Sequence, residues 1–234
     1  MVKALILAAG LGKRMRPLTN EMPKAMALLK GKPLLEHVLA ALKNSGIEEA
    51  VIVVGHLKEK IIEKFGNEFE GTKLKYVEQK EMNGTAKAIG LGKEFFGKLD
   101  EDFIVLSADV IVPEKCLKEL IEKNGFDVVI LAREEEHPEK FGVLEIDKKK
   151  NLVFGLEEKP ATPKSNLVNA GVYKFSAKIF DVIEKTGKNA LRNEFEITDS
   201  IKILLKERRK VGFVLCKEKI LDIGSLEELE NANN

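Results

Sequence analysis

The first apolar run of the chain leads directly into a segment rich in glycine and positive charge. This segment, LILAAGLGKRMRPLT at residues 5–19, contains Gly10 and Gly12. Its basic residues are Lys13, Arg14 and Arg16. Glycines let backbone amides close on an anion, and the basic side chains add charge that attracts it. The segment therefore predicts a polyphosphate-binding loop, with a solvated basic turn as the alternative interpretation.

Two established phosphate-binding patterns do not fit this loop. A P-loop requires a glycine five residues before Gly12, where the chain has Leu7. It also requires Ser or Thr after Lys13, where the chain has Arg14. A dinucleotide-binding loop requires a third glycine, where the chain has Met15, and an acidic residue near the end of the second strand, where VVGHL offers none. The loop must therefore bind phosphate in another way.

A glutamine amide provides a second chemical signal. Gln79 is the only glutamine of the chain and opens the segment QKEMNGTAKA at residues 79–88. Its amide presents a donor and an acceptor side by side, which suits the edge of a uracil or thymine ring, and Gly84 allows the backbone to complete the pairing. Gly84 and Thr85 would otherwise do no more than begin a helix. The residues alone leave both interpretations open.

Short apolar runs alternate with segments of helical periodicity in the first half of the chain. The apolar runs predict strands at 4–8, 50–55, 73–79, 102–109 and 127–132. The segments between them predict helices at 33–46, 58–65, 84–96 and 116–125. This alternation is typical of βα units around a parallel sheet, and ligands bind such sheets at the carboxyl ends of the strands.

The second half begins with closely spaced strands. FGVLEID, NLVFGLEEKP and NLVNAGVYKF predict antiparallel hairpins between residues 141 and 175. The remaining predicted elements are a helix at 194–207, strands at 211–216 and 219–224, and a last helix that Ser225 caps together with Glu228. We expect an α/β fold with a Rossmann-like, doubly wound mixed sheet and a small antiparallel β lobe, in a single domain over residues 1–234.

The charge balance excludes several classes of partner. The chain has 39 Lys and Arg residues against 38 Asp and Glu, so its net charge of +1 attracts neither nucleic acid nor an anionic membrane. No apolar run approaches the length that spans a membrane. Charged residues make up 33% of the chain, and this Lys/Glu-rich, amide-poor balance fits a thermophile.

The cysteines and histidines predict neither a zinc site nor a disulfide. Cys116 and Cys216 lie 100 positions apart without a CxxC partner, and the three histidines are scattered. We expect reduced thiols, with Cys116 as a packed residue, and a protein located in the cytoplasm.

The opening loop also resembles a family signature. LAAGLGKRMRPLT followed by PKAM is similar to the signature of the sugar-phosphate nucleotidylyltransferases, or NDP-sugar pyrophosphorylases, which reads Gly-x-Gly-Thr/Ser-Arg-Leu/Met-x-Pro-Leu-Thr and then Pro-Lys. The resemblance implies that the loop wraps a nucleotide triphosphate and that Arg14 and Lys24 are catalytic at the reacting phosphates. The implied nucleotide-binding residues are Ala8, Ala9, Gly10, Gly12, Lys13, Gln79, Gly84 and Thr85. Lys13 stands where the family commonly has Thr or Ser.

Two further segments resemble the metal-binding part of this family. VLSADV places Asp109 at the carboxyl end of a predicted strand, and ILDIGS supplies Asp222. The resemblance implies that both bind Mg²⁺, since two carboxylates with phosphate oxygens and water suit its octahedral coordination. The family segment usually reads Trp-x-Asp-x-Gly-Thr/Ser, so Ile220 replaces its tryptophan.

Segments on the sugar side complete the resemblance, which covers about residues 2–230. FGVLEID, LEEKP and VNAGVY are similar to segments that line the sugar phosphate. The implied sugar-phosphate-binding residues are Gly142, Glu158, Lys159, Asn169 and Gly171.

The resemblance also implies a reaction, in which an NTP and a sugar 1-phosphate give an NDP-sugar and pyrophosphate with Mg²⁺. UTP or dTTP is the expected nucleotide, and glucose 1-phosphate or N-acetylglucosamine 1-phosphate the expected sugar. The alternatives are a regulatory subunit of the same fold that binds nucleotide or sugar phosphate, and cytidylyl or guanylyl transfer to another sugar or polyol phosphate. We expect a catalytic domain without a C-terminal left-handed β-helix domain, as a monomer or dimer.

Overall fold

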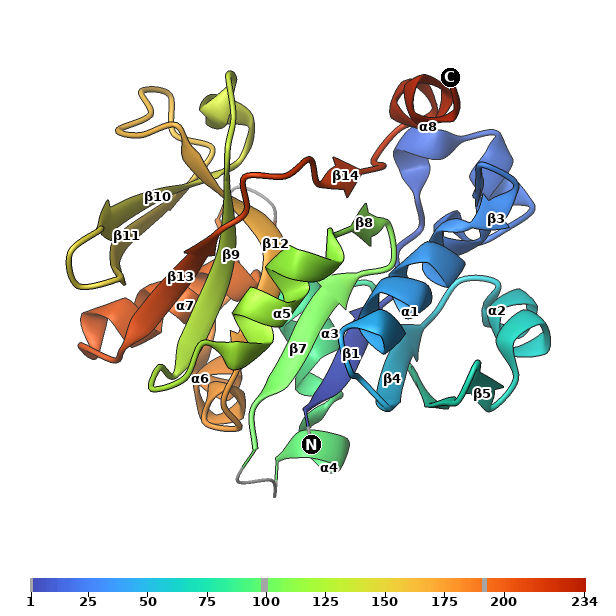
Figure 1. The fold of residues 1–234 in the computed structure, drawn as a ribbon, viewed down its shortest axis with the longest axis horizontal. Helices are drawn as coiled ribbons and strands as arrows, with labels where there is room; N and C mark the ends of the chain where they lie inside the picture. The colour runs from blue at the N-terminus through green and yellow to red at the C-terminus, as the bar shows by residue number, and fades with distance from the viewer. Residues whose placement is uncertain (1, 98–100, 191–192) are drawn as a thin grey trace.

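A ten-stranded mixed sheet runs through the molecule (Figure 1). The structure is a computed structural model that describes residues 2–97, 101–190 and 193–234. From one edge to the other, the strands are β10 (Gly142–Asp147), β11 (Leu152–Glu158), β13 (Val211–Leu215), β9 (Val128–Glu134), β12 (Leu167–Phe175), β7 (Phe103–Ser107), β1 (Lys3–Leu7), β4 (Glu49–Val54), β6 (Thr72–Glu78) and β5 (Glu68–Phe69).

Strands β7, β1, β4 and β6 form the parallel half of this sheet. β1 lies inside it, with Leu5 opposite Val51 of β4 and Val105 of β7. The central residues of β1, β4 and β7 are buried because helices cover both faces of the sheet. The predicted parallel sheet is confirmed for the strands expected at 4–8, 50–55, 73–79 and 102–109, whereas the strand expected at 127–132 is β9, which lies outside this half.

Strand β12 joins the parallel half to the rest of the sheet. It is antiparallel to both β7 and β9, and its register on β9 shifts between Asn169 and Tyr173. β13 then lies parallel to β9, and the antiparallel pair of β10 and β11 closes this edge. The predicted α/β fold with a mixed sheet is therefore confirmed, and its antiparallel strands continue the sheet at one end.

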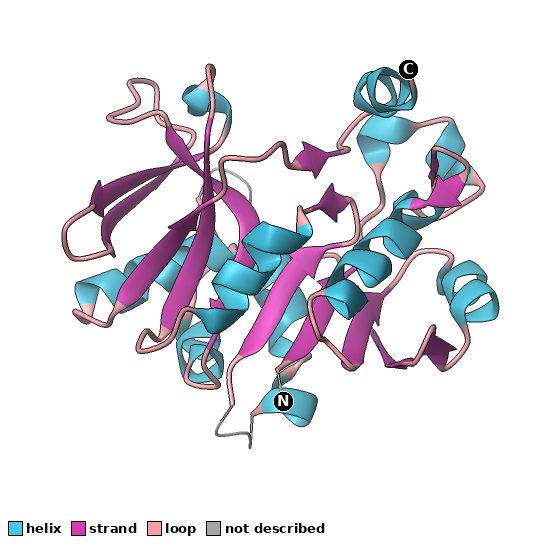
Figure 2. Cartoon of the chain, in the orientation of Figure 1, coloured by secondary structure: helices cyan, strands magenta, loops and turns pink. Residues whose placement is uncertain are grey.

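Helices cover both faces of the sheet (Figure 2). One face carries α1 (Leu34–Asn44), α2 (Lys58–Phe65) and α5 (Glu114–Glu122), of which α1 and α5 lie in front in Figure 1. The other face carries α3 (Thr85–Gly90), α4 (Lys93–Phe96), α6 (Ile179–Lys185) and α7 (Ile197–Lys206). The side chains of β1 alternate between the two faces of the sheet. Ala4 and Ile6 pack on the side of the first set of helices, and Leu5 packs on the side of the second.

A smaller apolar cluster anchors the segment that follows β1. Met15 is fully buried there, against α8 (Leu226–Asn233) and the hairpin of β2 (Leu28–Leu29) and β3 (Lys32–Pro33). The start of α8 is as predicted, since the Ser225 hydroxyl accepts a hydrogen bond from the Glu228 N–H at 3.2 Å. The basic loop is thus held in place by an apolar side chain at its centre.

Two predicted elements differ in the structure, and one helix was not predicted. The helix predicted at 84–96 is two helices, α3 and α4, and Gly92 before α4 packs so closely on β1 that a Cβ there would lie 3.0 Å from Leu5 Cδ2. α6 was not predicted from the sequence. The strand predicted at 219–224 is limited to β14 (Leu221–Asp222), which pairs with β8 (Val110–Ile111).

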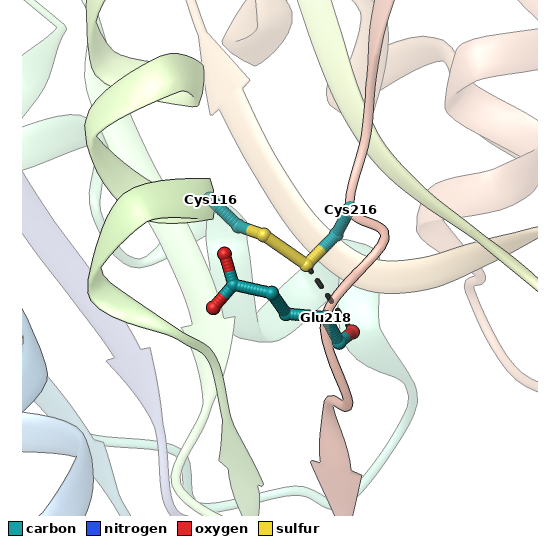
Figure 3. The surroundings of a disulfide bond; sticks show 3 residues. All are labelled: Cys116, Cys216 and Glu218. Carbon is teal, nitrogen blue, oxygen red and sulfur yellow. Dashed lines mark hydrogen bonds between the residues drawn. A yellow bond between two sulfur atoms is a disulfide. The ribbon is translucent and has the colours of Figure 1, made fainter.

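The prediction that the cysteines form no disulfide is wrong. Cys116 of α5 and Cys216, directly after β13, are joined by a disulfide (Figure 3). The sheet places β13 beside β9, on the face that α5 covers, so the two Cα atoms lie 5.5 Å apart in spite of a sequence separation of 100. Spacing along the chain did not report this proximity, because the intervening strands fold back beside α5.

The helices of the described ranges are all too short or too polar to cross a membrane.

Candidate active site

A cavity of about 500 Å³ opens at the carboxyl ends of β1, β6 and β7. It lies at the edge of the sheet where the fold predicts a ligand. Its walls also include the start of α3 and residues before α7. The predicted residues that line it are Ala8, Ala9, Gly10, Gly12, Lys13, Arg14, Lys24, Gln79, Gly84, Thr85 and Asp109. The structure therefore brings all the predicted nucleotide-binding residues into one cavity.

The conformation of the basic loop depends on Gly12. Its φ of 59° lies in the left-handed region, and a Cβ there would lie 2.8 Å from Thr19 Cγ2 and 3.1 Å from Lys24 Cβ. The Thr19 hydroxyl donates to the Gly12 carbonyl oxygen at 2.9 Å, which closes the loop. Lys13 and Arg14 follow in a short 3-10 helix, Lys13–Met15, that turns both of them to the surface while Met15 is buried.

Lys24 and Asp109 meet inside the cavity. Lys24 comes from a second 3-10 helix, Lys24–Met26, and Asp109 stands two residues beyond β7. The Lys24 Nζ donates to Asp109 Oδ2, and both side chains are largely buried. A basic residue predicted to act on phosphate is thus paired with a carboxylate predicted to bind metal.

Asp222 reaches the same place through the β8–β14 pairing. The register sets Asp222 opposite Val110, and the Ile223 N–H donates to the Asp109 carbonyl oxygen at 3.1 Å. Enclosure by the protein raises the pKa of Asp222, and repulsion from Asp109 raises it further. The side chain is nevertheless 41% exposed, so it stands at the rim rather than in the interior.

The two carboxylates fit a divalent cation. The charge of Asp109 raises the pKa of Asp222, so the two carboxylates lie close enough to interact, and Mg²⁺ is often held by one or two carboxylates together with substrate phosphates and water. Within residues 2–97, 101–190 and 193–234, no group of three or more His, Cys, Asp or Glu side chains is arranged to hold a metal. Phosphate and water would therefore complete the coordination.

Arg14 lies across Gly224, at the start of α8. A Cβ on Gly224 would lie 2.6 Å from Arg14 Nη2 and 3.1 Å from Glu228 Oε2. The Glu228 carboxylate accepts from the Gly224 N–H at 2.7 Å and from the Ser225 hydroxyl at 3.0 Å. Because Gly224 has no side chain, the Arg14 guanidinium has room at the rim of the cavity.

Gln79 and Gly84 share one wall of the cavity. Gln79 is buried, and its Nε2 donates to the Gly84 carbonyl oxygen at 3.4 Å. Gly84 has a φ of 118°, and a Cβ there would lie 2.4 Å from the Phe195 carbonyl oxygen. The Thr85 hydroxyl donates to Glu196 Oε2 at 3.1 Å and accepts from the Ile197 N–H at 3.0 Å. Thr85 therefore joins α3 to α7, while Gln79 and Gly84 shape the wall.

The predicted sugar-side residues form a second cluster. Gly142 pairs with Glu158, and a Cβ on Gly142 would lie 3.1 Å from Glu158 Oε2 and 3.6 Å from Asn169 Cβ. Asn169 Nδ2 donates to the Tyr173 hydroxyl at 2.6 Å, and Asn169 Oδ1 accepts from the Gly171 N–H at 2.9 Å. Gly171 has a φ of 72° at the irregularity of β12.

Tyr173 connects this cluster to the main cavity. Burial raises the pKa of the Tyr173 hydroxyl, and the negative charges of Glu158 and Glu196 raise it further. Glu196 lines the main cavity and Glu158 belongs to the sugar-side cluster, so both carboxylates lie near one buried hydroxyl. Lys159 is different, because its exposed side chain does not line the main cavity, and its N–H donates to the Phe141 carbonyl oxygen at 2.9 Å.

Arg133 is a candidate that the sequence analysis missed. It stands near the carboxyl end of β9, and its side chain is 11% exposed. Its Nη2 lies 3.8 Å from Asp222 Oδ2, and its Cζ lies 5.1 Å from the centre of the Phe141 ring. The sequence signal was a basic residue next to an apolar run, but the predicted strand ended at residue 132, one residue before Arg133.

The comparisons with known proteins agree with this geometry. Residues 3–234 match the family described as Nucleotidyl transferase. The chain is 41% identical over 212 residues to the "Bifunctional protein GlmU" of Methanocaldococcus jannaschii, covering 91% of this chain and 49% of that protein. It is 33% identical over 243 residues to the "UTP--glucose-1-phosphate uridylyltransferase AglF" of Haloferax volcanii, covering 99% of this chain and 95% of that protein.

A solved structure shows the same architecture. A UDP-glucose pyrophosphorylase complexed with UDP-glucose superposes with a TM-score of 0.89 at 28% identity, covering 100% of this chain and 98% of that one. The chain spans about half the length of the GlmU protein it matches, at 49%. The family resemblance expected from the opening loop is confirmed: this chain belongs to the nucleotidyl transferase family.

Proposed function

We propose that the chain transfers a nucleotidyl group from an NTP to a sugar 1-phosphate and releases pyrophosphate. The observation that carries the proposal is the convergence of Arg14, Lys24 and Asp109 on one cavity, with Asp222 beside Asp109. Two phosphorylated substrates repel each other, so a site that joins them must supply positive charge and fix their orientation. The cavity offers basic side chains for the first task and a walled pocket for the second.

Each basic side chain contacts a different phosphate group in this proposal. A phosphate oxygen of the sugar 1-phosphate attacks the α-phosphorus of the NTP in line, and the bond to the β-phosphate breaks on the opposite side. Lys24 donates to the α-phosphate, Arg14 to the departing pyrophosphate and Lys159 to the attacking phosphate. The rate enhancement comes from positioning and charge neutralisation, and no covalent enzyme intermediate forms.

Asp109 and Asp222 are the residues that would hold Mg²⁺. When bound, the ion neutralises charge on the phosphate oxygens. Lys24 stays within reach of both the carboxylate and the phosphates, because its ion pair with Asp109 lies inside the cavity.

The nucleobase and the sugar are assigned to different residues: the base to one wall of the cavity and the sugar to the second cluster. The amide of Gln79 and the backbone at Gly84 face the base, with UTP or dTTP as the nucleotide. Gly142, Glu158, Asn169 and Gly171 contact the sugar, with glucose 1-phosphate or N-acetylglucosamine 1-phosphate as the acceptor. The name of the Haloferax relative, a UTP–glucose-1-phosphate uridylyltransferase, supports the pair of UTP and glucose 1-phosphate.

The test is a matrix of five NTPs against a panel of sugar 1-phosphates, with pyrophosphate release as the readout. We expect turnover with UTP or dTTP and one of the two named sugars. Arg14→Ala should lower the rate roughly 10²–10³-fold, the scale of one lost charge-stabilising donor. Arg16→Ala is the matched control, because Arg16 is exposed in the same loop and does not line the cavity.

Two alternatives are separate outcomes of the same matrix. A regulatory subunit would bind nucleotide without releasing pyrophosphate from any pair. Turnover confined to CTP or GTP would replace the proposed nucleotide and leave the reaction class intact. The presence of Arg14, Lys24, Asp109, Lys159 and Asp222 favours the enzyme, since a regulatory subunit has no need of these groups.

A further inference from the structure

The guanidinium of Arg133 carries hydrogen-bonding capacity that the fold does not use. Its Nε and Nη1 are buried and make no hydrogen bond, although Nε lies 2.7 Å from Glu135 Oε1. A buried N–H without an acceptor costs about 1–3 kcal/mol, so such groups are uncommon in native proteins without a cause. An acceptor that arrives with a ligand is one such cause.

Arg133 stands between the metal side and the sugar side of the site. Its Nη2 is 3.8 Å from Asp222, and its Cζ lies 5.1 Å from the centre of the Phe141 ring. Phe141 directly precedes Gly142, and its carbonyl oxygen accepts from the Lys159 N–H at 2.9 Å. In the sheet, Arg133 pairs with Val168, the neighbour of Asn169. The guanidinium therefore adjoins both clusters.

Both carboxylates of the proposed metal site already have a basic partner. Asp109 is paired with Lys24, and Asp222 lies within 3.8 Å of Arg133. Lys24 and Arg133 thus offset the charge of these two carboxylates, and Arg133 also pairs with Glu135 at 2.7 Å. A divalent cation that approaches the protein alone must compete with both basic side chains, whereas phosphate groups offer these side chains new acceptors.

We propose that Arg133 is a counterion of Asp222 in the substrate-free protein and, once Asp222 turns to the divalent cation, donates guanidinium N–H groups to the phosphate of the sugar 1-phosphate. This inference rests on the proposed function. Arginine suits the second role because its planar fork donates two parallel hydrogen bonds to phosphate and keeps its charge at every working pH. Arg133 and Lys159, both of which contact Phe141, then share that phosphate.

The first measurement is Mn²⁺ binding to the substrate-free protein by electron paramagnetic resonance. Arg133→Gln removes the competing charge, so it should tighten Mn²⁺ binding about fivefold. Arg133→Lys keeps the charge and should bind Mn²⁺ within about twofold of the parent. Arg209→Gln is the matched control and should behave as the parent, because Arg209 pairs with Asp127 and Glu207 instead.

The second measurement is steady-state turnover with the best substrate pair. Both Arg133→Gln and Arg133→Lys should raise the KM for the sugar 1-phosphate about tenfold or more, because each removes the bidentate fork. The KM for the nucleotide should stay within about twofold, since the loop around Gly12 is untouched. The thermal midpoint of each variant is measured alongside, and the lysine variant retains the charge should the glutamine variant prove unstable.

Two results would overturn the inference. One is Mn²⁺ binding that is unchanged or weaker in folded Arg133→Gln, since Arg133 would then not compete for Asp222. The other is an unchanged KM for the sugar 1-phosphate in both variants. A parent that turns over no substrate pair would refute the proposed function instead, and the Mn²⁺ titration would still decide whether Arg133 is the counterion of Asp222.

Discussion

Replacing Gly224 by alanine should misplace Arg14 without disturbing the fold. An alanine Cβ at this position would lie 2.6 Å from Arg14 Nη2, whereas ordinary contacts between heavy atoms begin near 3.5 Å. The guanidinium must therefore move by about 1 Å. Gly224 has no positive φ, so alanine can adopt its backbone conformation, and the obstacle is the end of a flexible side chain.

The size of the effect follows from that displacement. A shift of about 1 Å in a group that stabilises a transition state can lower the rate about 10²-fold, or about 2.7 kcal/mol. We expect Gly224→Ala to reduce kcat by about that factor. Gly187→Ala is the matched control, because a Cβ at Gly187 would meet nothing within 4 Å and its φ is not positive, so turnover should stay at the parent level.

A double-mutant cycle tests the physical cause directly. If Gly224→Ala acts by moving Arg14, it should have no further effect on pyrophosphate release once Arg14 is alanine, since the displaced group is gone. Turnover is measured for the parent, both single variants and the double variant, with thermal midpoints as the check on folding. Equal losses from Gly224→Ala in both backgrounds would refute the reasoning, as would full activity of the single variant.

Three further predictions concern the metal site, the disulfide and the core. Replacing Asp109 and Asp222 together by asparagine should abolish Mg²⁺-dependent pyrophosphate release, and the same rate with and without Mg²⁺ in the parent would contradict the assignment. Replacing Cys116 and Cys216 by serine should lower the free energy of unfolding by about 4 kcal/mol in urea titrations, because the bond closes a loop of about 100 residues; an unchanged midpoint would mean that the bond does not form. Lys174→Met should lower the free energy of unfolding by about 3 kcal/mol in the same titration, because the carbonyl oxygens of Ile121 and Lys123 lose their donor. Equal stability of the variant and the parent would show that burying the Lys174 ammonium group is neutral.

Local sequence patterns predicted the elements that shape the cavity. The helix expected at 58–65 is α2 at the same bounds, and the strand expected at 50–55 is β4 at Glu49–Val54. In both elements the apolar residues recur at the spacing of the buried face, so a local pattern is enough to locate the element. The glycines of the opening loop were also informative, because the left-handed φ of Gly12 is a property of one residue and its neighbours.

Contacts between distant segments were beyond the reach of those patterns. The disulfide depends on β13 lying beside β9, and the neighbourhood of Asp109 and Asp222 depends on the two-residue pairing of β8 and β14. Neither pairing leaves a periodic signature. Arg133 was missed for the same reason, since only the folded sheet brings the end of β9 to Asp222 and Phe141.

The most direct measurement follows the α-phosphate of the nucleotide. The protein is incubated with UTP labelled at the α-phosphorus, glucose 1-phosphate and Mg²⁺, and the labelled products and pyrophosphate are quantified. A site that joins two phosphates should place the label in the sugar nucleotide and release an equal amount of pyrophosphate. Label that stays in the nucleotide with every NTP and sugar 1-phosphate tried, or that appears in a free monophosphate, would contradict nucleotidyl transfer to a sugar.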